Sequence, residues 1–288
     1  RVFKNFDLAE IAKYLDWGPF FQTWDLAGSF PAILDDEVVG VEARKVYADG
    51  QAMLKKIIEG RWLTANGVMG LFPANRVGDD IEFYTDETRS QVLMTWYGLR
   101  QQTEKQPGAD GLMRPSRCLA DFVATRESGI ADYAGLFAVT AGIGSEKKEK
   151  EFQDALDDYS SIMFKGLADR LAEAFAECLH QRVRTDLWGY AAGEGLSNEE
   201  LIKEKYQGIR PAPGYPACPD HTAKVALFDT LQAREIGMEL TESMAMFPAS
   251  SVSGFYLAHP QATYFVVGQI GDDQVQDMAA RRSMDVEE

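Results

Sequence analysis

The segment "GVMGLFPANRVGDDIEFYTD", residues 67–86, decides the fold class of this 288-residue chain. It contains two short apolar runs that are separated by Gly, Pro and Asn residues. This pattern predicts two strands joined as a β-hairpin. Because a hairpin joins antiparallel neighbours, the segment favours a sheet that is at least partly antiparallel.

Helical periodicity begins on the N-terminal side of this hairpin. Residues 7–15 have helical spacing, and Asp7 is placed to cap their first turn. Residues 36–58 form a longer amphipathic pattern, with an expected apolar stripe that includes Val38 and Val41. The sequence therefore predicts two helices before the hairpin.

The strongest periodic signal covers residues 148–187. Apolar residues, Leu156 among them, recur there at steps of three or four, and acidic residues occupy the opposite face. We expect one long helix or two nearly continuous ones. Ser197 and Glu200 form a capping box that starts a short helix. Further helices are expected at residues 87–104 and 220–235.

Several buried strands complete the pattern, and a loop at residues 105–117 is expected to be exposed. The strands are expected at residues 118–124, 133–142, 251–259 and 263–270. Unlike connections between these strands, some of them hairpin-like, favour an α+β layer over a doubly wound parallel sheet.

Composition excludes several classes of partner. The chain is 45% hydrophobic and carries a formal net charge of -16, so it can bury a core but lacks the basic face of a nucleic-acid or anionic-membrane binder. No apolar run reaches membrane-spanning length, and no signal peptide is evident. The widely spaced Cys118, Cys178 and Cys218 indicate a reducing cytoplasm. The abrupt ends suggest a piece of a longer protein.

Two candidate sites have simpler explanations. Gly142 and Gly144 follow an expected strand, as in a Rossmann cofactor site, but the third glycine and the acidic ribose-binding residue are missing. A plain turn is the alternative. Cys218 and His221 lack a second ligand pair, so we expect no metal. No nucleophile elbow or P-loop is present, and we expect no catalytic side chain.

The most unusual segment is "GIRPAPGYPACPDH", residues 208–221, which contains four prolines. Proline makes the segment stiff and extended, and we expect it to leave backbone polar groups for a ligand or water. Arg210 offers a planar fork suited to a carboxylate. Gly214 allows close backbone approach, and Tyr215 adds a flat ring. The alternative is a rigid surface connection with these side chains packed structurally.

This R-x-x-x-G-Y loop resembles that of the activation domain of cobalamin-dependent methionine synthase. Other long segments resemble the same domain in the same order, so the resemblance covers nearly the whole chain. They include "YLDWGPFFQTWDLAG" (14–28), the hairpin segment, "DDYSSIMFKGLADRLAEAFAECLHQRVR" (157–184) and "YFVVGQIGDDQVQDMAARR" (264–282).

The resemblance implies a single C-shaped α+β domain over residues 1–288, a fragment or subunit of a larger enzyme. It implies a central twisted antiparallel sheet flanked by helices, one of them long. Such a domain binds S-adenosylmethionine in a shallow groove. A flavodoxin-type reductase supplies an electron to inactive cob(II)alamin, which a separate cobalamin-binding domain presents, and S-adenosylmethionine supplies the methyl group. The resemblance thus implies a cytoplasmic methyltransferase module that does not turn over alone.

The resemblance also implies a set of ligand contacts. Arg210 would take the ligand carboxylate, and Tyr215 would face the cobalamin. Phe265 keeps a ring but lacks the hydroxyl of a family tyrosine. The complete set is Asp16, Glu173, Arg210, Ala212, Gly214, Tyr215, Tyr264 and Phe265.

Some alternatives stay open. Asp16 could simply form a turn, and Glu173 could lie on a solvated helix face. The domain could also be a non-catalytic sensor or docking module that binds S-adenosylmethionine. A stand-alone Rossmann methyltransferase would instead require strands alternating with helices around residues 142–144.

Overall fold

The computed structural model describes residues 1–286, which divide into two compact units. The first unit comprises residues 1–68, 138–206 and 232–252. The second comprises residues 69–137, 207–231 and those from 253 onward.

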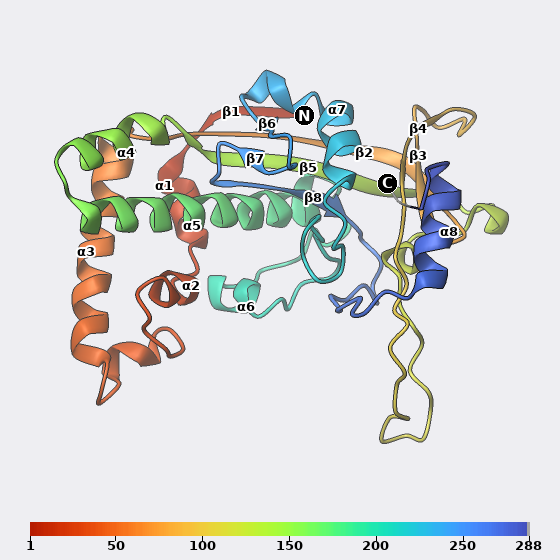
Figure 1. The fold of residues 1–288 in the computed structure, drawn as a ribbon, viewed down its shortest axis with the longest axis horizontal. Coiled ribbons are helices and arrows are strands. Elements are labelled where there is room, and N and C mark those ends of the chain that lie inside the picture. Colours follow the sequence, from red (N-terminus) through yellow and green to blue (C-terminus); the bar gives the residue numbers. More distant parts are fainter. Residues whose placement is uncertain (287–288) are drawn as a thin grey trace. The chain divides into compact units, whose positions relative to one another are not determined.

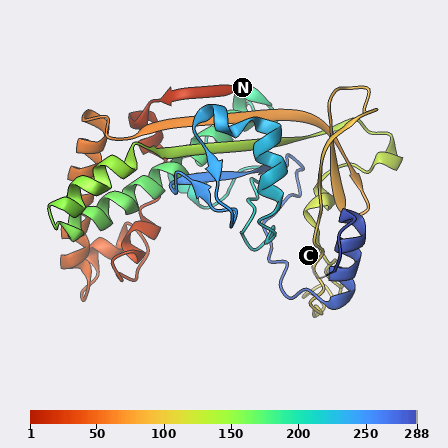
Figure 2. The same cartoon turned by 45° about the horizontal axis from the view of Figure 1, so that its top comes forward.

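The main sheet has six strands and confirms the α+β prediction (Figure 2). The order is β4-β3-β2-β5-β8, and β1 pairs with β2. Pairing is antiparallel between β1 and β2, β2 and β3, and β3 and β4. A second sheet pairs β6 (Glu239–Leu240) with β7 (Met246–Phe247). The main strands are β1 (Val2–Phe6), β2 (Thr64–Val77), β3 (Asp80–Tyr84), β4 (Val92–Trp96), β5 (Asp132–Ile143) and β8 (Ser251–Tyr256).

The hairpin predicted at residues 67–86 is confirmed as β2 and β3. Val77 pairs with Asp80, so two residues form the connection. Gly78 takes a φ of +61° there, in the left-handed region that favours glycine. The local turn chemistry therefore agrees with the antiparallel pairing.

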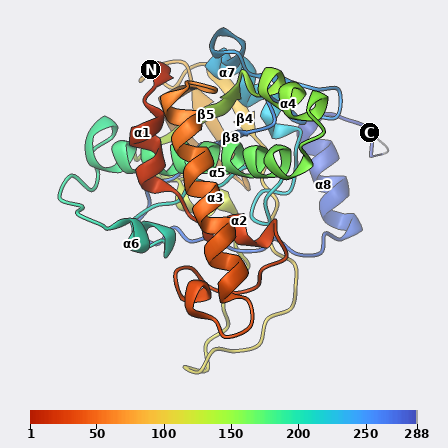
Figure 3. The same ribbon diagram turned by 90° about the vertical axis from the view of Figure 1, so that its left-hand side faces the viewer.

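Helices α1, α2, α3 and α4 of the first unit contact α5, the longest helix within residues 1–286 (Figures 1 and 3). We expected one long helix or two nearly continuous ones at residues 148–187, and the structure has two. A π-helix at Val183–Leu187 continues the second of them. The helices are α1 (Leu8–Ile11), α2 (Gly18–Gln22), α3 (Gly40–Glu59), α4 (Ser145–Asp154), α5 (Asp158–Arg182) and α6 (Asn198–Ile202).

Helix α5 packs closely on the sheet within the first unit. Phe175 is fully buried, and its ring lies 4.8 Å from that of Phe6. A Cβ on Gly67 of β2 would lie 3.1 Å from the Phe175 ring. The absence of a side chain at Gly67 lets the helix approach the strand.

The second unit contains the helices α7 (Ala223–Leu231) and α8 (Asp272–Arg282) and a cluster of packed aromatic rings. The Phe137 and Tyr256 rings stack with centroids 4.7 Å apart. Arg281 of α8 forms an ion pair with Asp80 and donates to the Gly98 carbonyl at 3.0 Å. These contacts fix the C-terminal helix to the β2–β3 end of the sheet.

Three element predictions are wrong. Residues 87–104 do not form a helix, because their apolar run pairs with β3 as strand β4. Residues 118–124 contain a buried 3₁₀ helix, Leu119–Phe122, instead of a strand. Residues 263–270 form no strand or helix and join no ladder.

Parts of the expected apolar stripes are also exposed. Val38 precedes α3 and is 89% exposed. Val41 lies in the first turn of α3 and is 73% exposed. Leu156 lies between α4 and α5 with a φ of +54° and is 89% exposed.

The Rossmann alternative does not fit the fold. Gly142 and Gly144 do lie between a strand, β5, and a helix, α4, but the sheet is antiparallel. A Cβ on Gly142 would lie 2.8 Å from Pro248, and Gly144 has a φ of +93°. Packing and turn geometry therefore account for both glycines. In residues 1–286, no helix is both long and apolar enough to cross a membrane.

The burial of α5 predicts the effect of two matched leucine substitutions. Leu171→Ala, at a fully buried position, should lower the free energy of unfolding by about 2–5 kcal/mol because it leaves a cavity. Leu156→Ala removes the same atoms from an 89% exposed position and should change it by less than about 0.5 kcal/mol. Urea unfolding measures both, and equal effects would contradict the packing described.

Candidate functional site

The proline-rich loop is held along the end of β8. The Ile209 N–H donates to the Leu257 carbonyl at 2.9 Å, and the Leu257 N–H donates back at 3.0 Å. The Phe255 N–H donates to the Pro211 carbonyl at 2.9 Å. The loop thus forms an irregular extra strand beside β8, although its prolines prevent a regular ladder.

Gly254 makes this close approach possible. A Cβ at this position would lie 2.4 Å from the Pro211 carbonyl oxygen and 3.2 Å from the Ala212 Cα. Both are backbone atoms, so the loop would have to move away from any side chain here. Sequence reasoning missed Gly254, although a glycine inside an apolar strand signals close backbone approach.

A tight turn follows at residues 212–218. The Tyr215 N–H donates to the Ala212 carbonyl at 3.1 Å, and the Gly214 N–H donates to the Cys218 carbonyl at 2.8 Å. Gly214 has a φ of +97°, and a Cβ there would lie 2.3 Å from Cε1 of His221. Gly214 is therefore required by the fold of the loop itself.

We expected this loop to leave backbone polar groups for a ligand or water. Many of its N–H groups are instead used by the protein itself. Those of Ile209, Arg210, Gly214, Tyr215 and Cys218 all donate hydrogen bonds within the second unit.

The irregular segment 263–270 lies against this loop. The Tyr264 hydroxyl accepts a hydrogen bond from the Arg210 N–H at 3.0 Å, and the Val267 N–H donates to the Pro216 carbonyl at 2.9 Å. The Phe265 ring lies 6.5 Å from that of Phe122. Hydrogen bonds to the loop therefore replace the strand ladder predicted here.

The second unit thus brings most of the predicted site residues together. Tyr215 is 53% exposed, whereas Ala212 is buried. Arg210, Tyr264 and Phe265 are half-buried. The arrangement is a partly exposed strip that carries the cationic side chain of Arg210 and the aromatic ring of Tyr215.

Asp16 and Glu173 lie in the first unit. The Asp16 Oδ1 accepts from the Gly18 N–H at 2.9 Å, so this residue does form a turn. The Asn198 amide donates to the Leu15 carbonyl at 3.1 Å and holds the start of that turn. Glu173 is half-buried, in a stretch of α5 where its neighbours on both sides are buried.

Several side chains that follow the tight turn, between Cys218 and Lys224, are partly or fully buried, and two of them have charged or polar partners. Lys224 Nζ lies 2.9 Å from Nδ1 of His221, and burial lowers the pKa of this lysine. Burial raises the pKa of the Cys218 thiol to about 12, so it stays protonated at neutral pH. Asp220 forms an ion pair with Arg282 of α8 at 3.2 Å.

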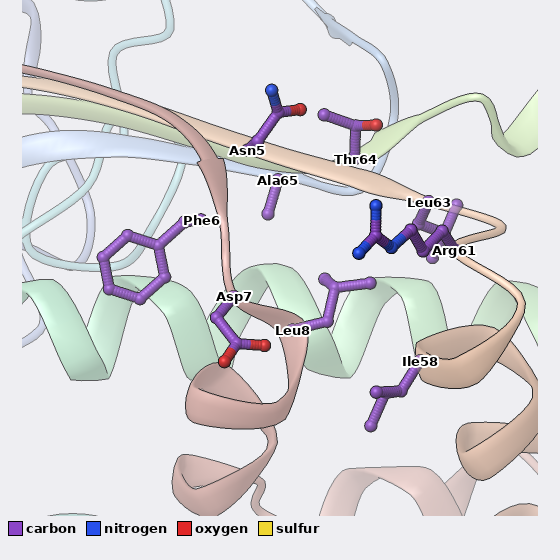
Figure 4. Close-up of a pocket in the computed structure, with 9 residues that line it drawn as sticks. All are labelled: Asn5, Phe6, Asp7, Leu8, Ile58, Arg61, Leu63, Thr64 and Ala65. Carbon is purple, nitrogen blue, oxygen red and sulfur yellow. The ribbon is translucent and has the colours of Figure 1, made fainter.

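Two cavities are lined by residues of the first unit alone. One, of about 510 Å³, is lined by residues such as Asp7, Ile58 and Arg61 (Figure 4). A second, of about 410 Å³, is lined by Leu15 and Trp17 among others. Neither contains a predicted ligand contact. Among residues 1–286, no group of three or more His, Cys, Asp or Glu side chains is arranged to hold a metal ion.

A family model and a solved structure, both of the same kind of domain, match nearly the whole chain. A family model for the vitamin B12 dependent methionine synthase activation domain matches residues 7–283. A crystal structure of the MetH reactivation domain bound to AdoHcy is 54% identical in sequence, with a TM-score of 0.93. The match covers 100% of this chain and 86% of that chain.

The contact at Gly254 predicts the effect of a single methyl group. Gly254→Ala should displace the loop from β8 and lower the free energy of unfolding by about 1–3 kcal/mol, because the clash is with backbone. The Phe255 amide should lose protection in hydrogen exchange. Gly193→Ala, where a Cβ meets nothing within 4 Å, is the matched control. Unchanged Phe255 protection in Gly254→Ala would refute the close approach.

Proposed function

Because the chain belongs to the vitamin B12 dependent methionine synthase activation-domain family, we propose that it binds S-adenosylmethionine along the proline-rich loop. The bound ligand donates its methyl group for the reductive methylation of inactive cob(II)alamin. This reaction returns cobalamin-dependent methionine synthase to its catalytic cycle.

One observation carries the proposal. The loop that holds Arg210 is fixed on both sides, by the end of β8 and by Tyr264. Arg210 itself is half-buried. A guanidinium carried on a fixed backbone suits the carboxylate of an amino acid, because its planar fork can donate two parallel hydrogen bonds. S-adenosylmethionine and AdoHcy, the ligand of the similar reactivation domain, both have this group.

The remaining contacts are proposed from the family resemblance. Asp16 and Glu173 supply negative charge, which suits a ligand with an ammonium and a sulfonium. The Gly214 and Ala212 backbone lies against the ligand. Tyr264 and Phe265 flank it, and the exposed Tyr215 ring faces the cobalamin side.

This chain acts by positioning. One electron from the reductase would first reduce cob(II)alamin to cob(I)alamin. The cobalt would then supply the electron pair for its bond to the methyl carbon, which would leave the sulfonium sulfur and release AdoHcy. No side chain has to remove a proton. Residues that hold the ligand in one orientation contribute by alignment, which can account for several kcal/mol. A partly exposed strip suits a methyl group that must reach a cofactor on another domain.

Partners and location follow from the same reaction. The cobalamin-binding domain of methionine synthase is the docking partner. A flavodoxin-type reductase is the proposed electron donor, and the cytoplasm is the proposed location. Cys118, Cys178 and Cys218 are buried free thiols, which suits a reducing compartment.

Arg210 gives the first test of this function. Arg210→Ala should weaken AdoHcy binding about 10- to 100-fold, the loss expected for charge-assisted hydrogen bonds of about 1.5–3 kcal/mol. Isothermal titration measures it, with the exposed Arg126→Ala as control. Asp16→Asn and Glu173→Gln test the two acidic contacts in the same way. Wild-type protein that releases no binding heat, or Arg210→Ala that binds equally well, would refute the proposal.

The methyl transfer itself gives the second test. The chain mixed with S-adenosylmethionine, free cob(II)alamin and a reductant should form almost no methylcobalamin, because nothing aligns the cofactor with the methyl group. Adding the cobalamin-binding domain should restore formation, as followed by absorbance. A chain that binds the ligand but never supports transfer would be a sensor or docking module.

A further inference from the structure

The second unit carries a hairpin-like arm at residues 101–117, drawn in yellow in Figures 1 and 3. It includes the loop predicted to be exposed at residues 105–117, and most of that loop is exposed. Hydrogen bonds of 2.9, 2.5 and 2.9 Å cross the arm, from Gln101 to Arg117, from Lys105 to Pro115 and from Gly108 to Leu112. Because these bonds join its two sides along its length, the arm is an ordered part of the unit.

The tip of the arm presents apolar side chains to solvent. Leu112 is 66% exposed and Met113 is 62% exposed. A Cβ on the preceding Gly111 would meet no described atom within 4 Å beyond its chain neighbours, so the space around the turn is open. Adjacent exposed apolar residues with a polar rim are typical of a surface that binds another protein, and methionine adapts well to such contacts.

The stem of the arm holds two cations that have no anionic partner. Lys105 and Arg117 are both half-buried, and neither forms an ion pair with any of residues 1–286. Burial lowers the pKa of Lys105, and the nearby charge of Arg117 lowers it further. The third cation of the arm, Arg114, is paired with Asp110 at 3.3 Å. Two like charges held together repel, and a carboxylate placed beside them would relieve this repulsion.

The sign of this cationic pair is opposite to that of the whole chain. The chain has a formal net charge of -16, so an acidic partner is repelled by it on average. A local pair of unpaired cations can then determine where such a partner docks and in which orientation. The pair therefore indicates a partner surface that carries carboxylates.

The stem is joined directly to a segment of the candidate site. The side-chain amide of Gln101 donates to the Val266 carbonyl at 2.7 Å, and its oxygen accepts a hydrogen bond from Lys105 Nζ at 2.6 Å. Val266 belongs to the segment 263–270, which contains two of the proposed ligand contacts. All of these residues lie in the second unit. A protein that docks on the stem would therefore lie beside the ligand strip.

We propose that the arm at residues 101–117 docks the domain that presents cobalamin. Carboxylates of that domain pair with the two cations of the stem, and an apolar part of its surface covers Leu112 and Met113. This inference rests on the proposed function, because it names the surface that the partner of the same reaction uses. Methyl transfer requires the cobalt to reach the methyl carbon, whereas an electron can be transferred over a longer distance. A docking surface joined to the ligand strip therefore suits the cobalamin-binding domain and not the reductase.

The test follows methylcobalamin formation by the 288-residue chain at increasing concentrations of the cobalamin-binding domain, with a chemical reductant in place of the reductase. Leu112→Ser combined with Met113→Ser should raise the half-saturating concentration of that domain about tenfold. Arg117→Gln should raise it about threefold at low salt and by less at high salt, because salt screens partly exposed charges. AdoHcy affinity in isothermal titration should be unchanged in both variants.

Two controls make the same kinds of change in the second unit but outside the arm. Ile130→Ser alters a 61% exposed apolar side chain, and Arg126→Gln removes a 55% exposed cation. Both should leave the half-saturating concentration within about twofold of wild type.

Arm variants that reach half-saturation at the wild-type concentration would overturn the inference and leave the proposed function standing. An effect seen only when a flavodoxin-type reductase replaces the chemical reductant would also overturn it, because the arm would then dock the reductase. Wild-type protein that fails to bind AdoHcy would instead refute the proposed function, and the inference with it.

Discussion

The backbone contact between the proline-rich loop and the end of β8 is the constraint on which the candidate site depends. Phe255 and Leu257 donate to carbonyls of the loop, and Gly254 leaves room for the two backbones to meet. Prolines alone would make this loop stiff but would not place it. The hydrogen bonds give the stiff segment a fixed position, and a segment that is already ordered loses less conformational entropy when a ligand binds.

Sequence patterns correctly predicted the elements that are stabilised by residues close to one another in the chain. Asp7 caps α1 as expected, and Ser197 and Glu200 form their capping box. The hairpin of β2 and β3 also follows from its own residues. The helix predicted at residues 87–104 is wrong because Val92 and its neighbours pair with β3. This tertiary contact overrides the helical spacing of the segment. Residues 263–270 look like a strand, but their hydrogen bonds go to the loop.

The residues of the candidate site could be predicted from the sequence, but the contacts that hold them in place could not. Arg210 and Tyr215 follow from the loop motif and from family resemblance. Gly214 was expected to admit a ligand, whereas its conformation and the His221 ring already require glycine. The Tyr264 hydroxyl was not expected to hold the Arg210 backbone. Each of these partners is distant in sequence or has no distinctive spacing, so only the folded chain identifies them.

The central claim is that Arg210, fixed by this framework, binds the carboxylate end of the ligand. The most direct measurement compares AdoHcy with 5′-methylthioadenosine in wild type and in Arg210→Ala as a double-mutant cycle. The account predicts that wild type prefers AdoHcy and that Arg210→Ala loses most of this preference. An undiminished preference in Arg210→Ala would contradict it.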